Sequence, residues 1–346
     1  MAQYQLNSPA QRIGRLKGEM LAHAMPVEVL AKGMGMKRMP KQKGDTIIYR
    51  RYIPFGSTLA NANRFTVDPL LHITTEGVTP NADSLTPQDV SVTINQYACL
   101  YGVSDKSLDL NEDGAEIPDE MKKQVGERMA LVKEMIRYGA AKACTNRFFA
   151  GGTSRATVDE SVTLSFLRRI TRSLKANHAK MLTSTLAASP NYATAPIEAG
   201  YIVCVHTDMD ANIRDLPGFK TVAEYGQRKP ICPEEIGSCE NFRFVTSPEL
   251  ASIPDSGAAI GTTNLLSTTG TNIDVYPVIV FGEDAAHDLA LRGKEALDPT
   301  WLPPGTKDKN DPLGQRGYIG AKFYAAAFIT NQGWMAVGEA GVSVLS

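Results

Sequence analysis

An acidic segment in the first half of the chain has the residue types and the spacing of a calcium-binding loop. Alternate positions carry Asp109, Asn111 and Asp113. Gly114 follows, where a sharp turn is needed, and Glu120 takes the twelfth position. Ca²⁺ takes about six to eight hard oxygen ligands, and alternate side chains of a tight turn can direct their oxygens inward. The candidate calcium ligands are therefore Asp109, Asn111, Asp113 and Glu120.

The same residues also suit a purely structural turn. The segment before Asp109 reads as a strand rather than as the helix that normally enters a calcium loop, and the eighth position is Glu116, where an apolar residue is usual. An acidic turn before a helix is favourable because the peptide dipoles at a helix N-terminus attract negative charge. Calcium binding therefore stays open, and we expect no other cofactor.

The other reactive residue types form no catalytic pattern. The five histidines stand apart from any Ser, Cys or carboxylate arrangement typical of a catalytic triad, and the chain has no G-x-S-x-G motif. The five cysteines include no C-x-x-C pair. We therefore expect a protein that is not an enzyme.

The charge of this 346-residue chain is close to neutral in total but unevenly distributed. The formal net charge is −1, yet residues 1–51 carry ten Lys or Arg against three acids. Residues 76–120 carry ten acids against one Lys. A split of this kind indicates a binding arm or two self-complementary surfaces, or simply two solvated faces of one monomer.

Two segments have helical periodicity. Between 119 and 149 apolar residues recur every three or four positions, which predicts a spine helix about 45 Å long at about 1.5 Å per residue. A second helix is predicted over about 160–182, with one apolar side. Its other side could meet DNA phosphates or only solvent, and it carries Arg168, Arg169, Arg172 and Lys175.

Two predicted strands flank a long segment with few core residues. Residues 46–55 are rich in β-branched and aromatic types, and residues 89–105 predict a half-buried strand in which apolar Val90, Val92 and Ile94 alternate with polar residues. The polar, turn-rich residues 56–88 between them predict an extended hairpin that projects from a body and needs a partner chain to lie on. Helices and strands are segregated along the chain, which favours an α+β fold. No apolar run reaches the roughly 18 residues that a membrane span requires, so we expect no membrane contact.

Several motifs resemble one known family. Those most specific to it are DVYPVIVFGEDA at 274–285 and DKNDPLGQRGY at 308–318. Supporting segments are Arg50-Arg51 with Pro54-Phe55-Gly56, Glu76 to Pro80, Ala150 to Arg155, His206 to Phe219, and Lys322-Phe323. Over about residues 45–340 the chain resembles the podovirus-type major capsid proteins of tailed double-stranded-DNA bacteriophages. It departs from them at Thr207, where a proline is expected, and the calcium pattern is not a property of that family.

The resemblance implies the HK-97-type capsid fold, with an N-terminal arm, an extended loop, a peripheral domain with a spine helix, and an axial domain. On this sequence the expected divisions are an arm at 1–44, an extended loop at 45–105, a peripheral domain at 106–182 and 311–346 with its spine helix at 119–149, and an axial domain at 183–310.

It also implies a structural function in the virion. Copies of the chain would form hexamers and pentamers of an icosahedral head around the genome, assembled in the bacterial cytoplasm. We expect the basic segment to meet the acidic segment of an adjacent copy. The predicted contact residues are Lys37, Arg38, Lys41, Lys43, Arg50, Arg51 and Glu76.

The other expected partners are a separate scaffolding protein, a portal protein at one vertex, a decoration protein, and packaged double-stranded DNA in non-specific contact. Two alternatives remain open at this point. The first is an encapsulin-like cellular compartment of the same fold. The second, from a different class, is a soluble calcium-dependent binding protein.

Overall fold

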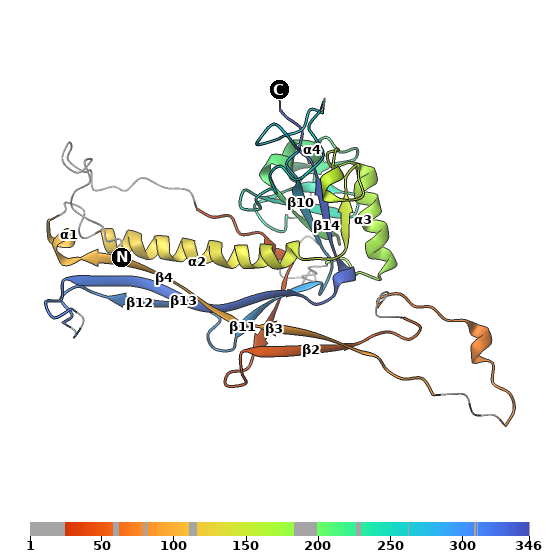
Figure 1. Ribbon diagram of the computed structural model, residues 1–346, viewed down its shortest axis with the longest axis horizontal. Helices are drawn as coiled ribbons and strands as arrows, with labels where there is room; N and C mark the ends of the chain where they lie inside the picture. The colour runs from red at the N-terminus through yellow and green to blue at the C-terminus, as the bar shows by residue number, and fades with distance from the viewer. Residues whose placement is uncertain are drawn as a thin grey trace, which may run out of the picture.

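A computed structural model shows an elongated subunit with a long platform, an upright sheet domain and a projecting hairpin (Figure 1). The structure describes residues 25–57, 62–77, 79, 82–110, 116–182, 199–225, 230–261, 263–307, 309 and 311–345. Most of the N-terminal arm predicted at 1–44 therefore lies outside the described residues. Within the described part of the chain, no helix is both long and apolar enough to cross a membrane.

The upright domain is built on a seven-stranded mixed sheet. In spatial order its strands are β5 (Arg147–Phe149), β14 (Met335–Ala340), β10 (Tyr276–Phe281), β6 (Tyr201–His206), β9 (Phe242–Ser247), β8 (Glu235–Cys239) and β7 (Lys220–Thr221). Every residue of β10 and β14 is buried. Both strands read as apolar runs because both faces of the sheet are covered.

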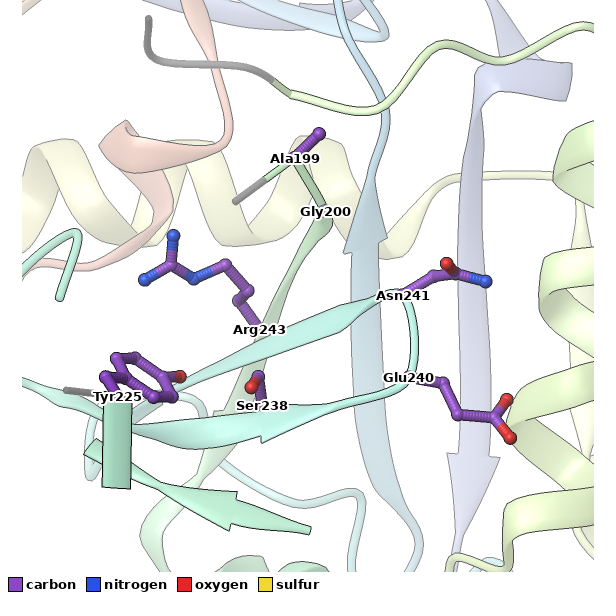
Figure 2. A pocket seen from close by; sticks show the side chains of 7 residues that line it. All are labelled: Ala199, Gly200, Tyr225, Ser238, Glu240, Asn241 and Arg243. Atoms are coloured by element: carbon purple, nitrogen blue, oxygen red, sulfur yellow. The ribbon is translucent and has the colours of Figure 1, made fainter. Parts of the chain in front are cut away.

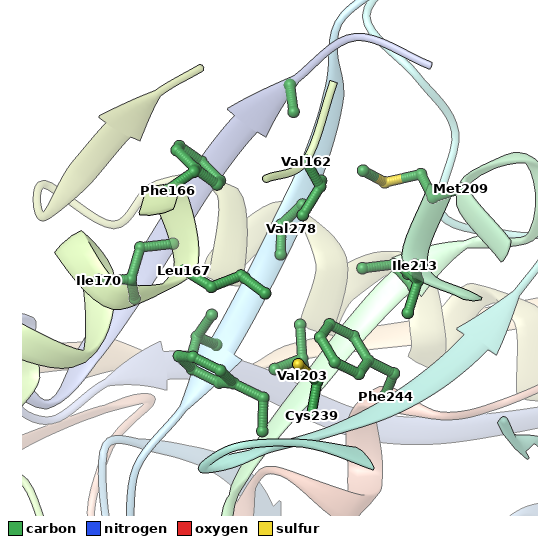
Figure 3. Packing of buried hydrophobic residues seen from close by; sticks show 14 of the residues in the cluster. Val162, Phe166, Leu167, Ile170, Val203, Met209, Ile213, Cys239, Phe244 and Val278 are labelled. Atoms are coloured by element: carbon green, nitrogen blue, oxygen red, sulfur yellow. The ribbon is translucent and has the colours of Figure 1, made fainter. Parts of the chain in front are cut away.

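One face of this sheet packs on α3 (Leu164–Ala176) and α4 (Asp210–Arg214). Figure 3 shows Phe166 and Ile170 of α3 directed into this core beside Val278 of β10. The opposite face packs on the C-terminal end of α2 (Ile117–Lys142) and on the 3-10 turn η2 (Leu30–Lys32). Alternate residues of β6 and β10 serve the two cores because successive side chains of a strand point to opposite faces.

The platform combines α2 with a second sheet. Its strands are β1 (Gly35–Met39), β11 (Ala286–Leu291), β13 (Arg316–Ile329), β12 (Asp298–Leu302) and β4 (Asn95–Ser104). The long strand β13 pairs with β4 and β12 over its first part and with β11 over its last. Val125 and Met129 of α2 pack on Ile319 and Phe323 of β13. A short helix, α1 (Asp105–Leu110), follows β4.

The hairpin consists of β2 (Thr46–Tyr52) and β3 (Pro87–Thr93), joined by a long connection that includes the 3-10 turn η4 (Pro69–His72). Its base packs on the platform, where the rings of Tyr49 and Phe328 stack with centroids 5.2 Å apart. In Figure 1 the outer part of the hairpin, which includes η4, extends away from both sheets. The projecting hairpin predicted from the sequence is therefore present, with its second strand ending at Thr93.

The predicted ends of both helices were wrong. α2 ends at Lys142 rather than 149, because Arg147–Phe149 pairs with β14 as strand β5, and the Arg147 guanidinium binds the carbonyl oxygens of Lys142 and Cys144. α3 is shorter than the predicted 160–182. Its first turn is capped by the Thr163 hydroxyl, and His178 takes a left-handed conformation with φ +56° just beyond its end.

The predicted domain divisions also differ from the sheets. The segment 147–182 and strand β14, predicted in the peripheral domain, belong with the seven-stranded sheet. Strands β11 and β12, predicted in the axial domain, lie in the platform sheet, and so does β4, predicted in the extended loop. Sheet membership depends on pairing between distant strands, as in β5 with β14, which local composition does not encode.

Candidate interaction surfaces

The described part of the basic N-terminal segment is a strap, residues 27–39, that crosses the body. Its backbone is held by Glu134 of α2, whose Oε1 accepts hydrogen bonds from the backbone N–H groups of Val29 (2.8 Å) and Leu30 (2.7 Å). Both side chains are fully buried, as is Met39 at the end of the strap. The strap is thus part of the folded core rather than a free arm.

A buried charge cluster fixes the strap to the platform. The Arg137 guanidinium contacts the carboxylates of Glu134 (3.1 Å), Glu28 (3.1 Å) and Asp288 (2.8 Å). Burial alone would lower the pKa of Arg137, but the Asp288 and Glu134 carboxylates raise it overall. This arginine therefore stays charged and links the strap to α2 and to β11.

The predicted intersubunit cations of the strap and the turn after it have different surroundings. Nζ of Lys37 lies 4.7 Å from the ring centroid of Tyr49, and Nε of Arg38 lies 2.8 Å from a carboxylate oxygen of Glu295. Lys41 and Lys43 are exposed in the turn that follows β1. Of the described residues of the basic segment, those of this exposed turn are therefore the most available to another chain.

The two predicted contact arginines of the hairpin are paired across its own strands. Nε and Nη2 of Arg50 each lie 2.8 Å from an oxygen of Asp89, and Nε of Arg51 lies 2.7 Å from Oε1 of Gln88. The hydrogen bond from Arg50 lowers the pKa of Asp89. Because Asp89 belongs to the acidic segment 76–120, part of the charge complementarity is satisfied inside one chain.

The outer part of the hairpin, which we call the distal loop (residues 64–86), carries a group of exposed apolar side chains. Leu70, Leu71 and Ile73 in and after η4 are 73%, 82% and 71% exposed. Phe65, Val67 and Leu85 are also exposed, and the predicted contact residue Glu76 is exposed in a turn of the same loop. Exposed apolar side chains gathered in one segment are typical of surfaces that bind another protein.

Sequence reasoning missed this apolar group. The segment 56–88 reads as polar and turn-rich because its Thr, Asn, Gly and Pro residues interrupt the apolar ones along its length. The run Pro69-Leu70-Leu71-His72-Ile73 was a local signal, since it places three large apolar side chains inside a turn-rich segment with no periodicity that would bury them.

Helix α3 carries an exposed basic face. The four predicted cations Arg168, Arg169, Arg172 and Lys175 are all exposed, opposite the buried stripe of Phe166, Leu167, Ile170 and Leu174. Arg168 pairs with Glu240, which lowers the pKa of that carboxyl group through their hydrogen bond. Arg169 donates to the carbonyl oxygen of Phe149 at 3.4 Å. Arg172 and Lys175 therefore form the part of this face most suited to an anionic partner.

Two of the four candidate calcium ligands, Asp109 and Glu120, lie among the described residues. Asp109 lies in the last turn of α1 and Glu120 in the first turn of α2, whereas Asn111 and Asp113 lie outside the described residues. The strand predicted before the loop is present as β4, but it ends at Ser104, and the short helix α1 leads into Asp109. The described residues include no group of three or more His, Cys, Asp or Glu side chains placed to hold a metal ion. Calcium binding remains a prediction.

A small cavity lies beside strands β8 and β9 (Figure 2). Its volume is about 20 Å³, and Tyr225 and Arg243 are among the residues that line it. Below it, the buried Glu235 carboxylate accepts hydrogen bonds from Arg243 and from the Tyr225 hydroxyl, both at 2.8 Å. A cavity of this size has room for a water molecule, whereas small-molecule sites typically enclose about 300–1,000 Å³.

Comparisons with known proteins identify the fold. No protein-family model matches the chain. The chain is 20% identical to a protein named major capsid protein of Pseudomonas phage KPP21, over an alignment that covers 86% of this chain and 85% of that protein.

Solved structures resemble the whole chain. The capsid protein of Ralstonia phage GP4 superposes with a TM-score of 0.64 at 12% identity, covering 100% of this chain and 99% of the other. The capsid protein of cyanophage Pam1 superposes with a TM-score of 0.59 at 12% identity, covering 99% and 100%. The fold is thus the HK-97-type fold of phage capsid proteins, a mixed α and β fold, and the predicted fold class is confirmed.

Proposed function

We infer that this chain is a phage major capsid protein, a structural protein whose copies build the capsid shell. The observation that carries this function is the likeness to phage capsid proteins along the full length of the chain, hairpin included, together with the capsid relative of Pseudomonas phage KPP21. The exposed apolar distal loop supports it, since a lone subunit leaves that surface in water.

In this proposal the subunits associate head to tail, so that the distal loop of one copy lies on the body of the next. Such heterologous contacts close into rings when the rotation per subunit permits. Slightly different rotations then give the hexamers and pentamers of an icosahedral head. Each large apolar side chain that becomes fully covered stabilises the contact by about 1.5–3 kcal/mol. Leu70, Leu71 and Ile73 together can therefore drive association.

The same proposal includes other components of the virion and its assembly. A separate scaffolding protein, a portal protein at one vertex and a decoration protein would join the shell, which assembles in the bacterial cytoplasm. Packaged double-stranded DNA would meet the basic face of α3 through phosphate contacts that depend on salt rather than on base sequence. Arg172 and Lys175 support this contact because both are exposed and α3 contains no acidic residue.

Electron microscopy of the purified chain tests the function. We expect capsomers or closed shells under assembly conditions, and DNA inside particles from infected cells. A 37.4 kDa monomer at every salt and protein concentration would contradict the proposal.

Calorimetry with Ca²⁺ tests the calcium alternative, where a binding signal from such a monomer would favour a calcium-dependent binding protein instead. Shells that hold a protein cargo and no genome would favour an encapsulin-like compartment.

A further inference from the structure

After β2, the chain approaches the upright domain again near the start of the distal loop. In Figure 1 the chain beyond β2 bends back toward the lower end of α3 and then runs outward. The bend needs Gly56, whose φ is +70° and where a Cβ atom would lie 1.8 Å from the carbonyl oxygen of Thr66. Residues 62–66 follow this bend and include the first residues of the distal loop.

At this bend two asparagine side chains pair reciprocally. Nδ2 of Asn63 donates to Oδ1 of Asn331 at 2.9 Å, and Nδ2 of Asn331 donates to Oδ1 of Asn63 at 2.8 Å. Asn331 is almost fully buried in the turn between β13 and β14, and its Oδ1 also accepts from the backbone N–H of Gly333. The Asn63 amide thus both donates to and accepts from Asn331, whose own side chain is held by burial and by the Gly333 N–H group.

An aromatic contact lies next to the amide pair. The Phe65 ring meets the edge of the His178 ring, with centroids 5.0 Å apart, and also contacts Phe55 at 5.4 Å. His178 lies two residues beyond the end of α3 and takes a left-handed conformation with φ +56°. Both contacts therefore join the same bend of the hairpin to the same corner of the upright domain.

The receiving corner is itself rigid and shaped for Asn63. Nε1 of Trp334 donates to the carbonyl oxygen of Asn177 at 3.0 Å, which ties the β13–β14 turn to the end of α3. A Cβ atom at Gly333 would lie 2.2 Å from Nδ2 of Asn63. A side chain at position 333 would therefore displace the Asn63 amide from its present position.

We propose that the Asn63–Asn331 amide pair and the Phe65–His178 ring contact form a latch that sets the direction of the hairpin before a second copy covers its distal loop. The proposal rests on the proposed function, because it assigns these residues a positioning role in assembly. A two-stranded hairpin has little stability of its own, and holding it in the bound orientation lowers the ordering cost of association. Neither Asn63 nor Phe65 belongs to the two cores of the upright domain, so the latch can be removed without opening either core.

Hydrogen exchange on the unassembled full-length chain, together with shell assembly at fixed salt, tests the latch. The variants are Asn63→Ala and Gly333→Ala, which break the amide pair from its two sides, and the control is Asn95→Ala, an exposed asparagine at the start of β4. We expect both latch variants to exchange roughly tenfold faster at residues 62–66 and to need about three- to tenfold more protein for assembly. Exchange in β10 and β14 stays as in the wild type, and the control changes neither measurement.

Two results would overturn the proposal. Unchanged exchange at 62–66 in both latch variants means that the contact does not hold the hairpin. Faster exchange with an unchanged or lower protein requirement for assembly means that the contact does not position the hairpin for docking. Failure of the wild-type chain to assemble at all would instead count against the proposed function, and the exchange result on the unassembled chain still decides whether the latch exists.

Discussion

The strap and the distal loop flank the first hairpin strand in sequence but relate to the body in opposite ways. The strap buries Val29, Leu30 and Met39 completely, and its backbone and charges find partners on α2 and β11. In the distal loop, the side chains of Leu70 and Leu71 are largely exposed to solvent. The strap finds its packing and hydrogen-bond partners within its own chain, so it is part of the fold of the single subunit. The distal loop finds no such cover among the described residues, and in the proposed function a second copy covers it.

Removing the anchor of the strap is expected to have the largest effect. Glu134→Ala leaves two buried N–H groups and the Arg137 guanidinium without their carboxylate, which costs about 3–5 kcal/mol. We expect a loss of that size in the free energy of unfolding, measured by denaturant titration of the unassembled chain. The control is Glu160→Ala, at an exposed surface position. Equal stability of the two variants would show that the strap is not part of the cooperative core.

A substitution in the distal loop should affect assembly much more than the stability of the subunit. Leu71→Ser changes the unfolding free energy by less than about 0.5 kcal/mol, because the side chain is exposed in the subunit. It weakens each subunit contact by about 1.5–3 kcal/mol, which is seen as a rise in the protein concentration needed for shells. Leu345→Ser, at another exposed leucine near the C-terminus, is the matched control. Normal assembly of Leu71→Ser would remove the distal loop from the interface.

The basic turn after the strap should show a smaller effect that depends on salt. Neutralising Lys37, Arg38, Lys41 and Lys43 together is expected to lower the shell yield or make it more sensitive to salt. The double variant Lys41→Ser/Lys43→Ser should account for most of the change, since Arg38 is already paired with Glu295. About 0.2–1 kcal/mol per exposed contact is expected. A shell yield that stays unchanged across salt concentrations would contradict the predicted contact with an acidic neighbour.

The smallest effect concerns pH and the docking of the strap. His287 lies under Gly35 of β1, stacks on Phe328 and hydrogen-bonds to Thr330. Burial, and then the charge of Lys37, lower its pKa below the ordinary 6.5, although Asp284 and Asp288 act in the opposite direction. The unfolded chain therefore takes up the proton first, so the stability from neutral His287 is complete above about pH 6.5 and declines as the pH falls below it.

The variant His287→Gln removes this titration. We expect its unfolding free energy to vary less between pH 7.5 and pH 5.5 than that of the wild type, measured by denaturant titration at each pH. Parallel pH profiles for the two proteins would show that the neutral imidazole does not contribute to docking of the strap.

Local patterns predicted several elements correctly. The apolar run of β10, the stripe of α3 and the alternation of β3 each arise from the periodicity of one element against a buried surface. The resemblance of the motifs at 274–285 and 308–318 to phage capsid proteins predicted the fold, which the comparisons confirm. The helix ends were wrong because residues outside the helices, such as the β5–β14 pairing, decided them.

An α+β fold, the hairpin and the basic side of α3 could be predicted without coordinates, because each depends on residue types at short spacings. The three-dimensional arrangement was needed to show which charges are already paired and which apolar side chains stay exposed. Arg50 meets Asp89 through the register of two strands, and Asn63 meets Asn331 across 268 positions. Such contacts depend on how distant segments meet in space, and this distinguishes the strap, which the chain completes, from the distal loop, which it leaves exposed.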